Sequence, residues 1–144
     1  MLWSEAVRLA VLEGRFDLRS GLDLLSEERR PRWQAAIDDA DSLPAAHFVG
    51  NGFTVTALQA AWAAIRENAA QAGEAQVRAA LETAVHIGND TDTVAAIAGA
   101  LVGARWGASC VLREWWQTVR GWPSLEADDL KRLGRDIAVA GAGV

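Results

Sequence analysis

Two carboxylates and a hydroxyl group stand close together in residues 88–93, which read Gly-Asn-Asp-Thr-Asp-Thr. Asp90, Asp92 and Thr93 lie within four residues of one another, so their oxygen atoms can converge on one point. Hard oxygen ligands of this kind suit Mg²⁺. Helix capping is the competing interpretation, because Asp and Thr are favoured at helix starts. One Asp would be enough for a cap, and two carboxylates on an apolar helix are costly to bury without a cation. We therefore predict a metal site here, with capping as the alternative.

The segment that follows the acidic residues is apolar on every face. Residues 94–104 contain only Ala, Val, Ile, Leu and Gly. A helix of this composition belongs in the middle of a bundle, so we predict a buried helix from Thr93 to Trp106. Gly99 and Gly103 each cost about 1 kcal/mol of helix propensity relative to Ala. Close approach of neighbouring helices would compensate for that cost.

The rest of the chain also has helical spacing. Apolar residues recur three or four positions apart from Thr54 onward, at Val55, Leu58, Trp62 and Ile65, which predicts an amphipathic helix. Further helices are expected over residues 4–14, from Ser26 to about 40, over 74–87, over 111–119 and from about 122. The expected inward positions of the second of these are Trp33, Ala36, Ile37 and Ala40. No alternating strand pattern and no internal repeat is present. The fold class is therefore all-α, a single compact helical bundle with residues 1–144 as one domain.

Composition narrows the class of protein. The chain has 144 residues, 51% of them apolar, and a net charge of −5 without a basic stripe, which argues against a nucleic-acid partner. Its longest apolar run, residues 94–104, is well below the ~18 residues that a membrane span needs. Cys110 is the single cysteine, so no internal disulfide can form, and the N-terminus lacks a signal peptide pattern. We expect a cytoplasmic protein with no membrane partner.

Residues 86–107, which read HIGNDTDTVAAIAGALVGARWG, closely resemble the C-terminal signature of the ADP-ribosylglycohydrolase family. In that family a Gly-x-Asp-Thr-Asp-Thr loop leads into an Ala/Gly-rich helix that ends in Gly-Ala-Arg-aromatic-Gly. Residues 50–55, Gly-Asn-Gly-Phe-Thr-Val, resemble the family's Gly-x-Gly-Tyr-Val loop. Residues 115–123 and 128–130 resemble its closing helices. The resemblance covers roughly residues 45–135 and corresponds to the C-terminal half of a family member.

The resemblance implies a Mg²⁺-dependent hydrolase that cleaves the bond between ADP-ribose and an acceptor such as a protein arginine, using two Mg²⁺ ions. Carried over by position, Asp90 and Asp92 would be catalytic and, together with Thr93, would bind the metal. The motif residues Asn51, Gly52 and Phe53 would lie against the ADP-ribose, with backbone N–H groups near its phosphates. The expected partner is ADP-ribose or an ADP-ribosylated protein. Phe53 stands where the family commonly has Tyr, so a hydroxyl donor is lost.

The family's N-terminal metal motifs, a Gly-rich Asp-containing segment and a Thr/Ser-Asp-Asp loop, are not recognisable here. Three side chains from one loop would leave two Mg²⁺ ions under-coordinated, because each takes six oxygen ligands. The upstream cluster of Asp38, Asp39 and Asp41 is expected to be a solvated helix end. His47 could contact phosphate or ribose, whereas His86 is expected to be a packed helix-end residue. The chain thus resembles half an active site. The alternative is a non-catalytic helical module that binds ADP-ribose or a partner chain supplying the N-terminal half.

Overall fold

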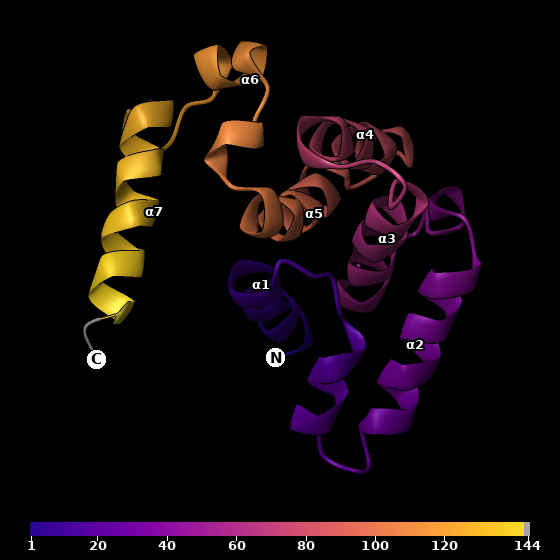
Figure 1. Cartoon of the computed structure of the whole chain (residues 1–144). Coiled ribbons are helices and arrows are strands. Elements are labelled where there is room, and N and C mark those ends of the chain that lie inside the picture. The colour runs from indigo at the N-terminus through magenta and orange to yellow at the C-terminus, as the bar shows by residue number, and fades with distance from the viewer. Residues whose placement is uncertain (143–144) are drawn as a thin grey trace. The chain divides into compact units, whose positions relative to one another are not determined.

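The computed structural model describes residues 1–142, and these residues fold into helices joined by short loops (Figure 1). The helices are α1 (Leu2–Glu13), η1 (Arg19–Leu24), α2 (Arg30–Ser42), η2 (Ala45–His47), α3 (Thr54–Glu67), α4 (Gly73–His86), α5 (Thr91–Trp106), η3 (Ala108–Cys110), α6 (Arg113–Thr118) and α7 (Ala127–Ala142), where η marks a 3₁₀-helix. Over residues 1–142 the only β-type pairing is an isolated bridge between Gly121 and Leu125. The predicted all-α class is confirmed. None of the helices in this range is long and apolar enough to cross a membrane.

The chain forms two compact units. Met1–Cys110 contains α1 to α5, and the second unit begins at Val111 and contains α6 and α7. In the first unit α5 packs against α1, α3 and α4, which makes it the central helix, as predicted. Its buried residues are Val94, Ala98, Leu101 and Val102. Ala96 and Ala100 are exposed, so the expectation that every face of this helix would be covered is wrong on that side.

Small residues and tryptophan N–H groups hold the helices of the first unit against α5. A methyl group placed on Gly99 would lie 3.4 Å from Leu81 Cδ2 of α4, an ordinary contact distance, so α4 lies beside this glycine without an approach that only glycine permits. At Gly103 a methyl group would meet no atom of the described chain within 4 Å, so the predicted close approach is absent there as well. Trp106 Nε1 donates to Oε1 of the buried Gln76 at 2.8 Å, which ties α5 to α4. Trp3 Nε1 donates to the Ile97 carbonyl at 3.2 Å and ties α1 to α5.

Three of the predicted helix starts are wrong. The last helix is expected from about residue 122, but α7 begins at Ala127, after the segment closed by the bridge between Gly121 and Leu125. Helix α1 begins at Leu2, so Ser4 lies inside it instead of capping it. Helix α2 begins at Arg30, four residues after Ser26, whose carbonyl instead accepts two turn hydrogen bonds from residues 29 and 30. Pro31 explains the later start, because proline has no N–H and suits the first turn of a helix.

Helices α2 and α3 are joined by polar contacts along their length. Gln59 Nε2 donates to the Ala36 carbonyl at 3.0 Å in the buried interface. Arg66 at the end of α3 donates to the Ala40 and Leu43 carbonyls at 3.0 and 2.9 Å, so it satisfies acceptors that the C-terminal end of α2 leaves open. These contacts fix the start of α3, and the loop before it, relative to α2.

Candidate functional site

The two motifs that carry the family resemblance lie in two loops that bond to each other. Residues 49–53, the glycine loop, precede α3, and residues 88–93, the acidic loop, lead into α5. Asn51 is 0% exposed; its Nδ2 donates to the Gly88 carbonyl at 3.0 Å and its Oδ1 accepts from the Asp90 N–H at 3.0 Å. In return, Asn89 Nδ2 donates to the Val49 carbonyl at 2.6 Å. The two loops therefore hold each other in place.

The backbone of the acidic loop turns sharply before α5. Gly88 and Asn89 have φ values of +85° and +59°, in the left-handed region that glycine and asparagine tolerate best. The Thr91 N–H donates to the Asn89 carbonyl at 2.9 Å across this turn. The turn sets Asp90 at the N-cap position of α5 and Asp92 in its first turn.

The acidic side chains are presented outward at the start of α5. Asp92 and Thr93 are exposed and Asp90 is partly exposed. Asp90 makes no side-chain capping hydrogen bond, although it occupies the capping position. Within residues 1–142 the carboxylates of Asp90 and Asp92 have neither a hydrogen-bond donor nor an ion-pair partner. Both carboxylates are thus open to a ligand, and the helix dipole at this end favours their charge.

The donor set of the acidic loop fits Mg²⁺ in kind but is incomplete in number. Two carboxylates and a hydroxyl are the oxygen donors that this ion takes, and it takes six. No group of three or more His, Cys, Asp or Glu side chains in the described part of the chain could hold a metal ion. Further ligands would have to come from water, from substrate oxygen atoms or from another polypeptide.

The upstream acidic cluster is engaged in structural contacts. Arg19 forms ion pairs with Asp41 and, at 2.7 Å, with Asp38 Oδ1. The hydrogen bond from Arg19 lowers the pKa of Asp38, and one from Gln34 adds to this. Trp62 Nε1 donates to Asp41 Oδ1 at 2.7 Å, which links the cluster to α3. These two carboxylates stabilise the packing around α2 and are not free to supply the ligands that the acidic loop lacks.

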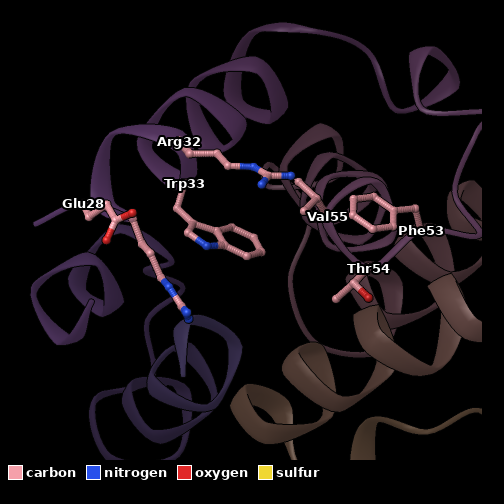
Figure 2. A pocket seen from close by; sticks show the side chains of 7 residues that line it. Glu28, Arg32, Trp33, Phe53, Thr54 and Val55 are labelled. Carbon is pink, nitrogen blue, oxygen red and sulfur yellow. The ribbon is translucent and has the colours of Figure 1, made fainter. Parts of the chain in front are cut away.

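A pocket of about 570 Å³ lies between the N-terminal ends of α2 and α3 (Figure 2). It is lined by charged and aromatic side chains: Glu28, Arg29, Arg32, Trp33, Phe53, Thr54 and Val55. Figure 2 shows the Trp33 ring projecting into the pocket, with Phe53 on the opposite side. Trp33 was predicted to point inward with its neighbours on α2, but it is partly exposed, whereas Ala36 and Ile37 are buried. Sequence reasoning did not identify this pocket.

A model of the ADP-ribosylglycohydrolase family matches residues 1–143. The chain belongs to the ADP-ribosylglycohydrolase family. The match extends beyond the motifs in residues 45–135 and takes in α1 and α2 as well. No curated protein and no solved structure gives a significant match.

In this member of the ADP-ribosylglycohydrolase family the predicted ligand-contacting residues differ in exposure. The Asn51 side chain is buried and its amide is occupied by the acidic loop, whereas Gly52 is exposed and Phe53 is 59% exposed. The backbone at Gly52 and the Phe53 ring are therefore the accessible parts of the motif. His47 is exposed and its ring stands edge-on to Phe48, with centroids 5.3 Å apart. His86 is also exposed, so the expectation that it packs at the end of α4 is wrong.

Proposed function

We propose that this chain hydrolyses the bond between ADP-ribose and an acceptor, with Mg²⁺ held by Asp90, Asp92 and Thr93. The observation that carries the proposal is the acidic loop in a glycohydrolase-family chain: its two carboxylates have no partner within residues 1–142 and stand at the start of the central helix. A side chain that had evolved only to cap α5 would bond to the open N–H groups of the first turn.

The residues of the two loops have different roles in this proposal. Asp90, Asp92 and Thr93 bind the metal, and Asn51 holds their loop at a fixed distance from the glycine loop through its 3.0 Å bonds. The Gly52 backbone and the Phe53 ring contact the ADP-ribose. The bound Mg²⁺ supplies positive charge that orients substrate oxygen atoms and polarises the scissile bond. Carboxylate charge at this site also suits the oxocarbenium-like state of glycoside cleavage.

The small number of ligands favours a second candidate function. Because the described residues gather no third carboxylate, histidine or thiolate at the acidic loop, the metal would be weakly held by this chain alone. A chain that binds ADP-ribose without turning it over, or that completes its site with a partner polypeptide, accounts for the same observation.

Calorimetric titration with ADP-ribose, with and without Mg²⁺, tests the proposal. We expect Mg²⁺-dependent binding that Asp92→Ala abolishes. The matched control is Asp39→Ala, which removes an exposed carboxylate on α2, and it should bind as the wild type does. Binding that needs no Mg²⁺ and survives Asp92→Ala would overturn the metal site. A hydrolysis assay on ADP-ribosylated arginine then separates the two candidates, since binding without turnover supports the non-catalytic module.

A further inference from the structure

A smaller pocket lies within the unit that begins at Val111, and it shares no residue with the glycine loop or the acidic loop. Its volume is about 170 Å³, below the roughly 300–1,000 Å³ of sites for drug-sized molecules, so it suits a small molecule. The residues that line it come from α6, from the segment after α6 and from the start of α7: Trp116, Gln117, Arg120, Glu126, Ala127 and Asp128. Backbone hydrogen bonds of 2.8 and 2.7 Å between Gly121 and Leu125 close the intervening turn and hold the two sides of the pocket together.

The charge of this pocket is negative and poorly neutralised. Two carboxylates and one guanidinium group give the lining a formal charge of −1 (+1 − 2). The Arg120 guanidinium is engaged by the backbone, because its Nη1 donates to the Gln117 and Val119 carbonyls at 3.1 and 2.7 Å. Its Nη2 lies 3.9 Å from Glu126 Oε1, which is too far for a hydrogen bond. Asp128 is exposed, and its carboxylate has no partner within residues 1–142. Both carboxylates therefore lack a hydrogen-bond donor.

The aromatic side of the pocket also favours a cation. Trp116 is partly exposed, and Lys131 Nζ of α7 lies 5.6 Å from the centroid of its ring. Tryptophan is the aromatic side chain that attracts cations most strongly, so this ring already holds one ammonium group of the chain itself. Lys131 follows Asp128 by three residues, and the two side chains are therefore neighbours on the surface of α7. The ring and the open carboxylate thus meet where an ammonium group is favoured.

The arrangement of the two carboxylates favours one kind of cation. Glu126 and Asp128 stand on either side of the buried Ala127, so their oxygen atoms reach a ligand from different positions. An ammonium group carries three N–H donors that point in different directions, whereas a guanidinium group presents a planar fork that suits a single carboxylate. A quaternary ammonium ion would use the ring but offer no N–H donor to the carboxylates. A primary ammonium group uses the ring and both carboxylates.

We propose that this pocket binds a primary alkylammonium ion, with its N–H groups on Glu126 and Asp128 and its charge beside the Trp116 ring. The inference is independent of the proposed function, because it requires neither Mg²⁺ nor ADP-ribose. It gives the second unit a binding role of its own.

The test is a titration of the full chain with n-butylammonium chloride at constant ionic strength in EDTA, followed by NMR of the tryptophan indole N–H groups. Trp116→Phe identifies the Trp116 signal by its disappearance. We expect a saturable shift of this signal with n-butylammonium. n-Butanol has the same alkyl chain without the charge and should give no saturable shift. Tetramethylammonium has the charge without N–H donors and should bind more weakly than n-butylammonium.

The carboxylates are tested with charge-removing variants. Glu126→Gln and Asp128→Asn should each weaken n-butylammonium binding by about three- to tenfold, the effect of losing one charge-assisted hydrogen bond. Asp136→Asn is the matched control, since it removes the same charge from an exposed residue of α7 outside the pocket, and it should bind as the wild type does.

Lys131 provides a variant with the opposite effect. Lys131→Gln should strengthen n-butylammonium binding by about two- to threefold, because a competing ammonium group leaves the Trp116 ring. Arg135→Gln is its control, because Arg135 is an exposed cation of the same helix that does not line the pocket, and this variant should leave the affinity unchanged.

Several outcomes would overturn the inference. One is equal affinity of the wild type and a Glu126→Gln/Asp128→Asn double variant that is folded by far-ultraviolet circular dichroism. Equal weakening by Asp136→Asn and Asp128→Asn would mean that only the overall charge of α7 matters. Tighter binding of methylguanidinium than of n-butylammonium would make the site one for planar cations. A shift that rises without saturation would exclude a site. The proposed function fails separately, because absent ADP-ribose binding in Mg²⁺ leaves the n-butylammonium result unchanged.

Discussion

Asn51 Oδ1 accepts a hydrogen bond from the Asp90 N–H at 3.0 Å, and the Asn51 side chain is 0% exposed. The same amide donates to the Gly88 carbonyl at 3.0 Å, so one buried side chain satisfies a donor and an acceptor of the acidic loop. No smaller side chain can make both bonds. The position of Asp90 is therefore coupled to the glycine loop, 39 residues earlier in the chain.

Asn51→Ala should lower the free energy of unfolding by about 1–3 kcal/mol, because the Asp90 N–H and the Gly88 carbonyl lose their partner in a poorly solvated place. Urea denaturation measures this change. Asn68→Ala is a control for an ordinary stability loss, since Asn68 Nδ2 donates to the Ala64 carbonyl and to Thr83 Oγ1 at the far end of α3.

The two variants should differ in ligand binding. Asn51→Ala should also weaken Mg²⁺-dependent binding of ADP-ribose, because the acidic loop loses its fixed position, whereas Asn68→Ala should bind as the wild type does. If both variants bind ADP-ribose equally well at a temperature where each is folded, Asn51 has no positioning role and is only a structural residue.

Local patterns predicted most of the helices because their causes are local. The recurrence of apolar residues from Val55 to Ile65 fixed both the existence and the start of α3. The predicted helix starts were wrong where a serine suggested a cap that the structure does not use. Helix α2, for example, begins near Pro31, and Ser26 lies in the preceding turn. The prediction that α5 is covered on every face was wrong, because composition alone gives no information on which side of an apolar helix lacks a neighbour.

The site was predictable only in part, for a related reason. The spacing of Asp90, Asp92 and Thr93 is a local signal, and the structure presents all three at the start of α5. The bond from Asn51 to the acidic loop joins residues that are distant in sequence, so no spacing could reveal it. The pocket at Trp33 depends on how the N-terminal ends of α2 and α3 meet. The i, i+3, i+4 spacing of Arg29, Arg32 and Trp33 fits a solvated helix face equally well, so the sequence alone does not predict a pocket there.

Metal-free Asp92→Ala should lose only about 0.3–1 kcal/mol of unfolding free energy, because the exposed carboxylate contributes through the dipole of α5 and has no partner in the described chain. Adding Mg²⁺ should raise the melting temperature of the wild type and leave that of Asp92→Ala unchanged. Differential scanning calorimetry in EDTA and in Mg²⁺ measures both effects. A capping role predicts the same stability difference in the two buffers, so an equal difference would refute metal binding by Asp92.

Arg66→Gln should lower the free energy of unfolding by about 1–3 kcal/mol, because the Ala40 and Leu43 carbonyls at the end of α2 lose charged donors at 3.0 and 2.9 Å. Chemical denaturation gives the value. Arg32→Gln on the same helix pair is the control; its side chain is exposed without an ion-pair partner in the described residues, and it should change stability by less than about 0.5 kcal/mol. A similar loss of unfolding free energy in both variants would contradict this. It would mean that surface charge matters here, and not the hydrogen bonds to the carbonyls at the end of α2.

Asp17 should make the stability of the first unit depend on acid pH. Partial burial raises its pKa, but hydrogen bonds from the Ser20 hydroxyl and backbone N–H and from Arg15 outweigh this, and the pKa falls from 3.8 to about 2. The folded state then holds the ionised form more favourably, by about 1–2 kcal/mol after allowance for solvent screening. This stabilisation is complete above pH 4 and is lost as the pH falls towards 2.

Asp17→Asn removes the titration, so the difference in unfolding free energy between wild type and variant should shrink over that interval in urea titrations at successive pH values. Carboxylates remote from Asp17 titrate equally in both proteins and cancel. A difference in unfolding free energy that stays constant from pH 5 to pH 2 would contradict this prediction. It would show that Asp17 contributes through hydrogen bonds that do not depend on the charge of its carboxylate.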